Sequence, residues 1–223
     1  MQTFINYFFS FKFFPSLIVA TLLFAIYMPK RKLFWLRLIL SFLAVCTASA
    51  FMWRFARSDI VTAALGNFAY VLCDVTFFFV IAAFLCFNFK CSFIEAVLYD
   101  STGWCVEHIA NSLTVIFALL LNMGVETLYF NYSTEYFVLT VLVYLIVYIA
   151  AAIAFWAFCR GSTIKLNKKR VLLPSVLVLF VTALMGVYTP IADVQPNVMI
   201  ILKLFAIVCC ITSLCLALSM FEA

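Results

Sequence analysis

Long apolar runs, separated by short basic clusters, constrain this chain of 223 residues more than any other feature of its sequence. Hydrophobic residues make up 68% of the chain and charged residues only 10%, which is too little charge to cover the surface of a soluble domain. Ten of the fourteen Lys and Arg residues form three clusters: Lys30, Arg31, Lys32 and Arg37; Lys90; and Arg160, Lys165, Lys168, Lys169 and Arg170. The runs between them predict a polytopic membrane protein whose main partner is the lipid bilayer.

The apolar runs predict an all-α fold, a bundle of seven transmembrane helices that forms one domain over residues 1–223. We expect the spans at about residues 13–28, 33–53, 60–87, 91–121, 136–159, 171–189 and 198–221. The first of these is short, because sixteen residues rise only about 24 Å in a helix, against a hydrocarbon core of about 30 Å. Residues 4–11 therefore either lengthen this span or lie along the membrane interface.

The basic clusters orient the bundle. In a seven-span chain the connections alternate between the two sides of the membrane, and all three clusters then lie on the side of the C-terminus. Cytoplasmic loops of membrane proteins carry an excess of Lys and Arg, which predicts an outer N-terminus and an inner C-terminus. The net charge of +5 has the same source and does not indicate nucleic-acid binding. Four basic residues lie toward the outer side, and we expect one of them, Lys203, to extend its ammonium group outward to water.

Short motifs for cofactors, metals and catalysis are missing from the sequence. The nine cysteines, most of them inside apolar runs, show no Cys-x-x-Cys spacing, so neither a disulfide framework nor a zinc site is expected. His108 is the only histidine, and no Gly-x-Ser-x-Gly, His-Glu-x-x-His, Walker A or dinucleotide-binding motif occurs. We therefore expect no cofactor, no metal ion and no catalytic residue, although some membrane-embedded enzymes act without such a motif.

The fourth predicted span carries the densest group of polar residues within an apolar run. Asp100, Glu107 and Asn111 are separated by seven and four residues, so they share one face of the helix. Gly103 lies on the same stripe, where a missing side chain lets another helix approach closely. An acid at the centre of a membrane helix costs about 2.5–3.5 kcal/mol on insertion scales. The stripe therefore faces protein or water and not lipid.

Two further residues extend this polar stripe. His108 is about 100° around the helix, at the edge of the stripe. Asp74 in span three is the expected partner of the stripe, through His108 or a shared proton. Trp104 lies beside the stripe and is a candidate for lining a pocket. The predicted site for ligand binding or signal coupling comprises Asp74, Asp100, Trp104, Glu107, His108 and Asn111. The alternative interpretation is that the same groups only hold spans three and four together by hydrogen bonds.

The segment Gly103-Trp104-Cys105-Val106-Glu107-His108-Ile109-Ala110 resembles a fourth-helix stretch in the membrane domains of bacterial GHKL-type sensor histidine kinases. Those domains have a Gly followed by a Gln-His-Ile-Ala run, and Glu107 stands here where Gln is expected. The apolar opening followed by Pro29-Lys30-Arg31-Lys32 is also similar. The resemblance implies the input domain of a two-component system in a bacterial plasma membrane, a homodimer, and a small-molecule or peptide signal at the outer face.

In that family a phosphoacceptor helix pair and an ATP-binding domain follow the last span, and neither motif occurs in residues 1–223. We therefore expect this sequence to be the sensor module alone. Two other functions use the same polar residues and stay open at this point. One is a small-solute or ion transporter, and the other is a membrane-embedded lipid-modifying enzyme.

Overall fold

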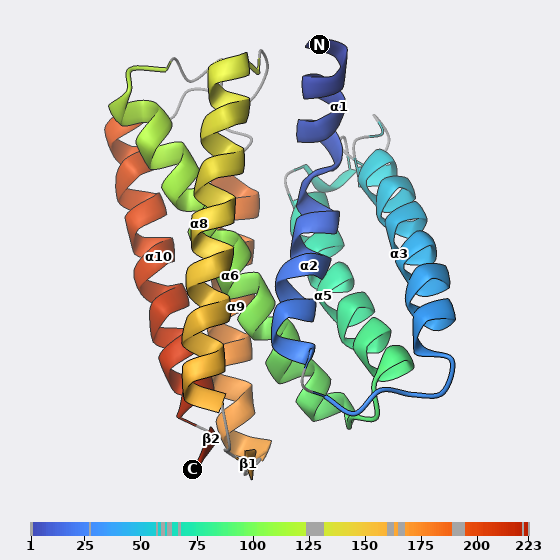
Figure 1. The fold of residues 1–223 in the computed structure, drawn as a ribbon. Helices are drawn as coiled ribbons and strands as arrows, with labels where there is room; N and C mark the ends of the chain where they lie inside the picture. Colours follow the sequence, from blue (N-terminus) through green and yellow to red (C-terminus); the bar gives the residue numbers. More distant parts are fainter. Residues whose placement is uncertain are drawn as a thin grey trace.

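The computed structural model describes residues 2–26, 28–56, 58, 61, 64–66, 68–123, 132–159, 163–164, 168–188, 195–219 and 221–222. Its helices are α1 (Gln2–Phe11), α2 (Phe13–Ala25), α3 (Phe34–Ala56), α5 (Phe68–Asn88), α6 (Phe93–Leu120), α8 (Thr134–Cys159), α9 (Lys168–Tyr188) and α10 (Pro196–Leu218). Two short strands, β1 (Thr163–Ile164) and β2 (Phe221–Glu222), pair antiparallel. The prediction of an all-α architecture is confirmed at this level (Figure 1).

Five helices in the described residues are long and apolar enough to cross a membrane: Phe34–Ala56, Phe68–Asn88, Phe93–Leu120, Thr134–Ala157 and Pro196–Leu218. Two shorter apolar helical stretches, Phe13–Ala25 and Leu172–Met185, accompany them. These lengths fit the bilayer, because about 20 residues are needed to span its hydrocarbon core. The chain is therefore a helical membrane protein, as its composition predicts.

Helices α1 and α2 run end to end (Figure 1). The hydrogen-bond ladder continues across Lys12, whose backbone N–H donates to the Phe8 carbonyl at 2.7 Å and whose carbonyl accepts from Ser16 N–H at 3.0 Å. Together the two helices cover residues 2–25, a rise of about 36 Å at 1.5 Å per residue. Of the two alternatives for residues 4–11, the structure shows the lengthened helix.

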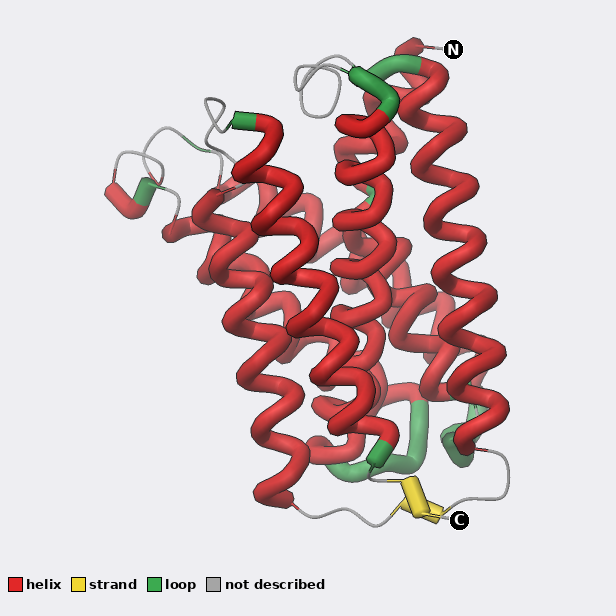
Figure 2. The backbone as a smooth tube through the Cα atoms, turned by 90° about the vertical axis from the view of Figure 1, so that its left-hand side faces the viewer, coloured by secondary structure: helices red, strands yellow, loops and turns green. Residues whose placement is uncertain are grey.

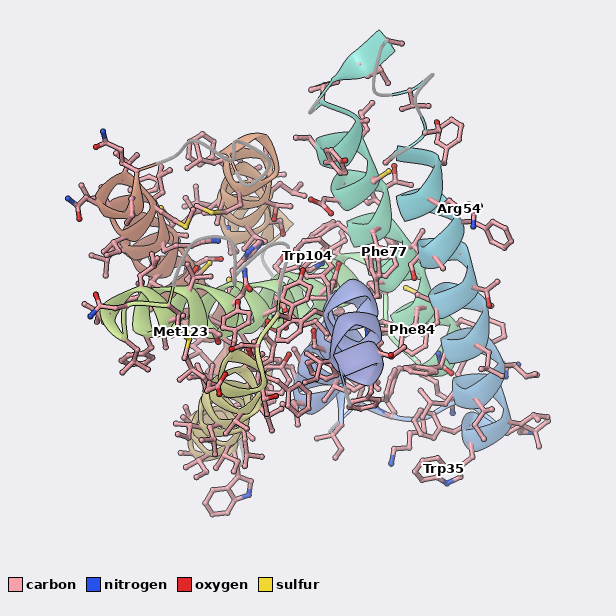
Figure 3. The ribbon with its side chains drawn as sticks, turned by 90° about the horizontal axis from the view of Figure 1, so that it is seen from above. Trp35, Arg54, Phe77, Phe84, Trp104 and Met123 are labelled. Carbon is pink, nitrogen blue, oxygen red and sulfur yellow. The ribbon has the colours of Figure 1, made fainter. Side chains whose placement is uncertain are left out.

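Helix α6 is the centre of the bundle. It crosses the other helices at a steep tilt and contacts α2, α5, α8, α9 and α10 (Figures 1 and 3). Of the five long helices α6 is the least apolar and the most buried, whereas α8 is the most apolar and among the least buried. This is the distribution expected when lipid is the solvent, because polar residues are then driven to the inside.

One end of the bundle is fastened by hydrogen bonds between the connection after α2 and the connection after α5. The Arg31 Nε donates to the carbonyls of Cys86 and Phe89 at 3.0 and 2.9 Å, and Lys90 N–H donates to the Pro29 carbonyl at 2.8 Å. We call this set of bonds the Arg31 clasp. The paired strands and the C-terminus lie at the same end, opposite the N-terminus (Figure 2). The first two basic clusters are thereby joined at the end that also holds the C-terminus.

Candidate functional site

Buried polar side chains concentrate on the central helix α6. Seven of its polar residues are buried: Asp100, Ser101, Thr102, Glu107, His108, Ser112 and Thr114. They form two groups along the helix axis. Glu107 and His108 face helices α8 and α9, and Asp100 lies about two turns earlier, beside Trp104. We call the first group, with Lys12, Lys203, Tyr144, Tyr148 and Thr182, the Glu107 cluster.

Glu107 is the junction of three helices. It is fully buried, and its two carboxyl oxygens lie 2.7 Å from the hydroxyl oxygens of Tyr144 and Tyr148 on α8. The two tyrosines are four residues apart, so they share the face of α8 that meets α6. The Tyr148 hydroxyl is also 2.9 Å from the carbonyl oxygen of Ser16 on α2. One carboxyl group thus connects α6, α8 and α2.

The Tyr148 hydroxyl has one proton and two neighbouring acceptors, Glu107 Oε2 and the Ser16 carbonyl. When Glu107 is ionised, the hydroxyl proton is drawn to the carboxylate, because a charged acceptor makes the stronger bond. When Glu107 is protonated, its own O–H donates to Tyr148, and Tyr148 donates to Ser16. The two protonation states of Glu107 therefore differ in whether α8 is hydrogen-bonded to α2.

Lys12, at the junction of α1 and α2, places a positive charge beside this carboxyl group. Its ammonium lies 4.9 Å from the ring centroid of Phe9 and 5.1 Å from that of Tyr144, in cation–π geometry. It attracts Glu107 electrostatically, although the Glu107 oxygens are hydrogen-bonded to the tyrosines. Lys12 thus offsets the charge of an ionised Glu107 without displacing either tyrosine.

His108 joins α6 to α9. Its Nε2 is 2.9 Å from the hydroxyl of Thr182, which itself donates to the Val178 carbonyl at 2.9 Å. Because the Thr182 proton is used in that bond, Nε2 carries the proton and donates to Thr182. The expected pairing of His108 with Asp74 is not what the structure shows. Asp74 lies half-buried on α5 and, within the described part of the chain, makes no hydrogen bond.

Lys203, on α10, is only 4% exposed, so the expectation that it reaches outward to water is wrong. It repels both Lys12 and His108 electrostatically, which places all three near one another. A buried cation is therefore held next to a second cation and a histidine.

The second group on α6, around Asp100, contains polar atoms without hydrogen-bond partners. Both carboxyl oxygens of Asp100, Trp104 Nε1 and Thr21 Oγ1 are buried and make no hydrogen bond to any described residue. Trp104 is enclosed by aromatic rings, with centroids 5.6 Å from Phe13 and 6.1 Å from Phe78. In Figure 3 its ring lies on the central helix, in the interior of the bundle and on the side of Phe77. Trp104 is thus buried core, and its N–H group lies beside the Asp100 carboxyl group without meeting hydrogen-bond geometry.

Gly103 brings α6 against α2, as the stripe predicts. A Cβ atom added at Gly103 would lie 2.8 Å from the Cα of Thr21 and nearer still to its hydroxyl oxygen. Only a residue without a side chain permits this approach. On the opposite side, Ser101 hydrogen-bonds Ser175 of α9 at 2.9 Å, and Ser213 of α10 donates to the Pro174 carbonyl at 3.1 Å. Small residues therefore fasten α6 to α2 and to α9, and α9 to α10.

The predicted site residues are only partly brought together. Glu107 and His108 belong to one cluster, Asp100 and Trp104 lie earlier on the same helix, and Asp74 and Asn111 are half-buried without hydrogen bonds in the described part of the chain. The predicted site did not include Lys12, Tyr144, Tyr148, Thr182 and Lys203. The tyrosines had a detectable signal, since two phenols four residues apart in an otherwise apolar run mark a polar face.

Comparisons with known protein families, with characterised proteins and with solved structures found no match to this chain. In the described residues, no three His, Cys, Asp or Glu side chains are grouped as ligands for a metal ion. The geometry of the buried clusters is therefore the basis for assigning a function.

Proposed function

We propose that this chain is a membrane-embedded sensor module in a bacterial plasma membrane, the input part of a two-component system. In this proposal the Glu107 cluster is the element that a signal changes. The observation that carries it is the position of the Tyr148 hydroxyl, 2.7 Å from Glu107 and 2.9 Å from the Ser16 carbonyl. A single proton decides between those two bonds, so the site has two arrangements that differ in how α8 is joined to α2.

The signal reaches the inner end through helix packing. Lys203, a member of the Glu107 cluster, lies on α10, and α10 ends at Leu218 close to the C-terminus. Helix α6 contacts α10 along its length and contacts α2 and α8 as well. A change in the α2–α8 bond therefore changes the surroundings of α10. A ligand can drive this change only by its difference in affinity for the two arrangements.

The proposed membrane topology has seven spans with the N-terminus outside. The five long helices supply five spans, the continuous α1–α2 pair supplies one, and α9 with 21 residues supplies the last. The Arg31 clasp and the start of α9 carry basic residues at the end that holds the C-terminus, which supports a cytoplasmic location for that end. A reporter tag at residue 223 tests this orientation, since a tag exposed outside the cell contradicts it.

The test of function is a chimera in which the full chain is fused to the cytoplasmic part of a sensor histidine kinase. Glu107→Gln replaces the carboxyl group by an amide that cannot ionise, so we expect kinase activity fixed at one level under all conditions that modulate the unaltered chimera. Tyr144→Phe is the matched control, because it removes a bond to Glu107 and leaves the Tyr148–Ser16 bond. Autophosphorylation in membrane vesicles is the measurement. Unchanged modulation in Glu107→Gln contradicts the proposal.

An ion transporter is the second candidate, and the unpartnered carboxyl group of Asp100 is the observation that favours it. Buried acids inside membrane bundles mark ion or proton pathways in many transporters. Ion flux through proteoliposomes that contain the purified chain tests this candidate. Flux that is lost in Asp100→Asn supports transport, and its absence in the unaltered chain contradicts it.

A further inference from the structure

Two arginine side chains meet at the C-terminal end of α5. Carbonyl groups in the last turn of a helix have no partner within that helix. The Arg31 Nε donates to the Cys86 carbonyl at 3.0 Å, and the Arg37 Nη1 donates to the Phe87 carbonyl at 3.2 Å. Because these two carbonyls belong to consecutive residues, both guanidinium groups are held within one turn of the helix. We call Arg31 and Arg37 the arginine pair.

Two lysines belong to the backbone segments that hold this pair. Lys30 faces Phe89 in an antiparallel bridge, and the next residue, Lys90, donates its backbone N–H to the Pro29 carbonyl at 2.8 Å. Opposed residues in such a bridge have Cα atoms only about 4.5–5.5 Å apart. Lys30, Arg31 and Lys90 therefore lie on two segments in direct contact, and all three are exposed.

Acidic residues do not balance this positive charge. Residues 28–40 and 86–95 form the two connections and the start of α3, and they contain five basic residues and one acid, Glu95. Glu95 Oε2 accepts the Ser92 N–H at 2.6 Å and closes the capping box at the start of α6. A guanidinium group has five N–H donors, and each member of the arginine pair meets the end of α5 through a single nitrogen. The pair is therefore suited to bind an anion in addition to α5.

The surface beside the arginine pair favours a lipid as the source of that anion. Trp35, Leu36, Ile39 and Leu40 of α3 are 70%, 54%, 58% and 58% exposed. Helix α3 is apolar and long enough to cross the membrane, and the Trp35 ring lies at the outer edge of the bundle (Figure 3). Tryptophan is enriched where a membrane helix meets the headgroups. An anionic phospholipid matches both the charge and the adjoining apolar face, whereas a soluble anion or an acidic peptide matches only the charge.

We propose that the arginine pair binds the phosphate group of an anionic phospholipid, at the end of the bundle that holds the C-terminus. Guanidinium groups fit phosphate oxygens with paired N–H donors, and Lys30 and Lys90 add positive charge beside them. The lipid would join the connection after α2, the start of α3 and the end of α5. This site is separate from the Glu107 cluster, so it stands or fails independently of the sensor function.

The experiment is a lipid titration of the purified full chain in micelles of an uncharged detergent. Native mass spectrometry counts the bound molecules of phosphatidylglycerol, which is anionic, and of phosphatidylcholine, whose choline group cancels the phosphate charge. We expect saturable binding of phosphatidylglycerol, with a Kd about tenfold lower than that of phosphatidylcholine. Glycerol phosphate carries the phosphate without acyl chains, and we expect it not to displace the lipid at equal concentration.

Variants decide whether the preference belongs to the arginine pair. We expect Arg37→Gln to weaken the binding of phosphatidylglycerol about tenfold, because one charged hydrogen-bond donor is lost. The double variant Lys30→Gln with Lys90→Gln keeps both arginines on α5 and is also expected to weaken binding about tenfold. Arg54→Gln is the matched control, since Arg54 is an exposed cation in the last turn of α3, at the other end of the same helix. It should bind both lipids as the unaltered chain does.

Three outcomes would overturn this site. The first is equal affinity of the unaltered chain for the two lipids, and the second is an unchanged lipid preference in both Arg37→Gln and the double lysine variant. If Arg37→Gln does not fold, the double lysine variant alone decides. The third is displacement of the lipid by an equal concentration of glycerol phosphate, which would show that the acyl chains contribute nothing.

Discussion

Glu107 and Tyr148 are 41 residues apart in the chain and are joined by a 2.7 Å hydrogen bond in the interior of the bundle. The bond connects the central helix α6 to α8, and the same hydroxyl group lies 2.9 Å from the Ser16 carbonyl of α2. Polar bonds between membrane helices are worth about 0.6–2 kcal/mol each. Because these bonds meet at Glu107 and Tyr148, we expect this junction to affect both the stability of the bundle and the balance between its two proposed arrangements.

Tyr148→Phe removes the hydroxyl that serves two helices, whereas Tyr144→Phe removes a hydroxyl that serves one. We expect Tyr148→Phe to lower the free energy of unfolding by about 1–3 kcal/mol, because Glu107 also loses a buried partner. The loss for Tyr144→Phe should be smaller. Unfolding of both variants in the same micelles measures the difference. Equal losses would show that the Ser16 bond contributes nothing.

Gly103→Ala introduces a methyl group where the backbone of α2 is closest to α6. Because the Thr21 Cα would lie 2.8 Å from the new atom, the two helices must separate. We expect a loss of about 1–3 kcal/mol in the free energy of unfolding, as for other overpacked sites. The double variant Gly103→Ala with Thr21→Ala relieves only the hydroxyl contact, so it should recover part of the loss. Full recovery would show that the backbone contact is unimportant.

Asp100→Asn replaces a fully buried acid whose two oxygens lack partners in the described residues. If the carboxyl group binds nothing, its replacement by an uncharged amide of the same shape should raise the free energy of unfolding by about 1–2 kcal/mol. Denaturant unfolding in micelles measures this gain. A loss of stability instead would reveal that Asp100 holds a partner, as the transporter candidate requires.

Arg31→Gln breaks the side-chain half of the Arg31 clasp, which consists of bonds to the Cys86 and Phe89 carbonyls. Arg31 is exposed, so we expect a loss of only about 1 kcal/mol in unfolding free energy. The larger effect should be local, with faster amide exchange at residues 28–33 and 88–92. Hydrogen exchange followed by mass spectrometry measures it, and Lys32→Gln is the control. Unchanged exchange at both connections would contradict the role of the clasp.

The features that depend on lipid as the solvent were predictable from the sequence. The apolar runs marked the long helices, and the polar stripe on residues 100–111 identified α6 as the helix that must lie inside. Gly103 was identified as a point of close approach, because a glycine on the inward face of a membrane helix lets another helix come near. These conclusions need only the period of the helix and the cost of polar groups in hydrocarbon.

The partners of the polar groups were not predictable in the same way. The stripe was expected to pair with Asp74 through His108 because spans three and four follow each other in the chain, but His108 Nε2 lies 2.9 Å from the Thr182 hydroxyl on α9. Lys203 was expected to reach water because it lies near the end of a span. Which way a long side chain turns depends on the helix beside it, and no local pattern in the sequence contains that information.

The junction at Glu107 also bears on how the protein is made. The chain is synthesised from its N-terminus, so α6 is made before α8. Tyr144 follows Glu107, the acid that it binds, by 37 residues. Until α8 arrives, Glu107 lacks both phenols, and a chain that stops short of Tyr148 never acquires them. Premature products of this gene would therefore carry a membrane-embedded acid without its two phenol partners, and burying a polar group that lacks hydrogen bonds is costly.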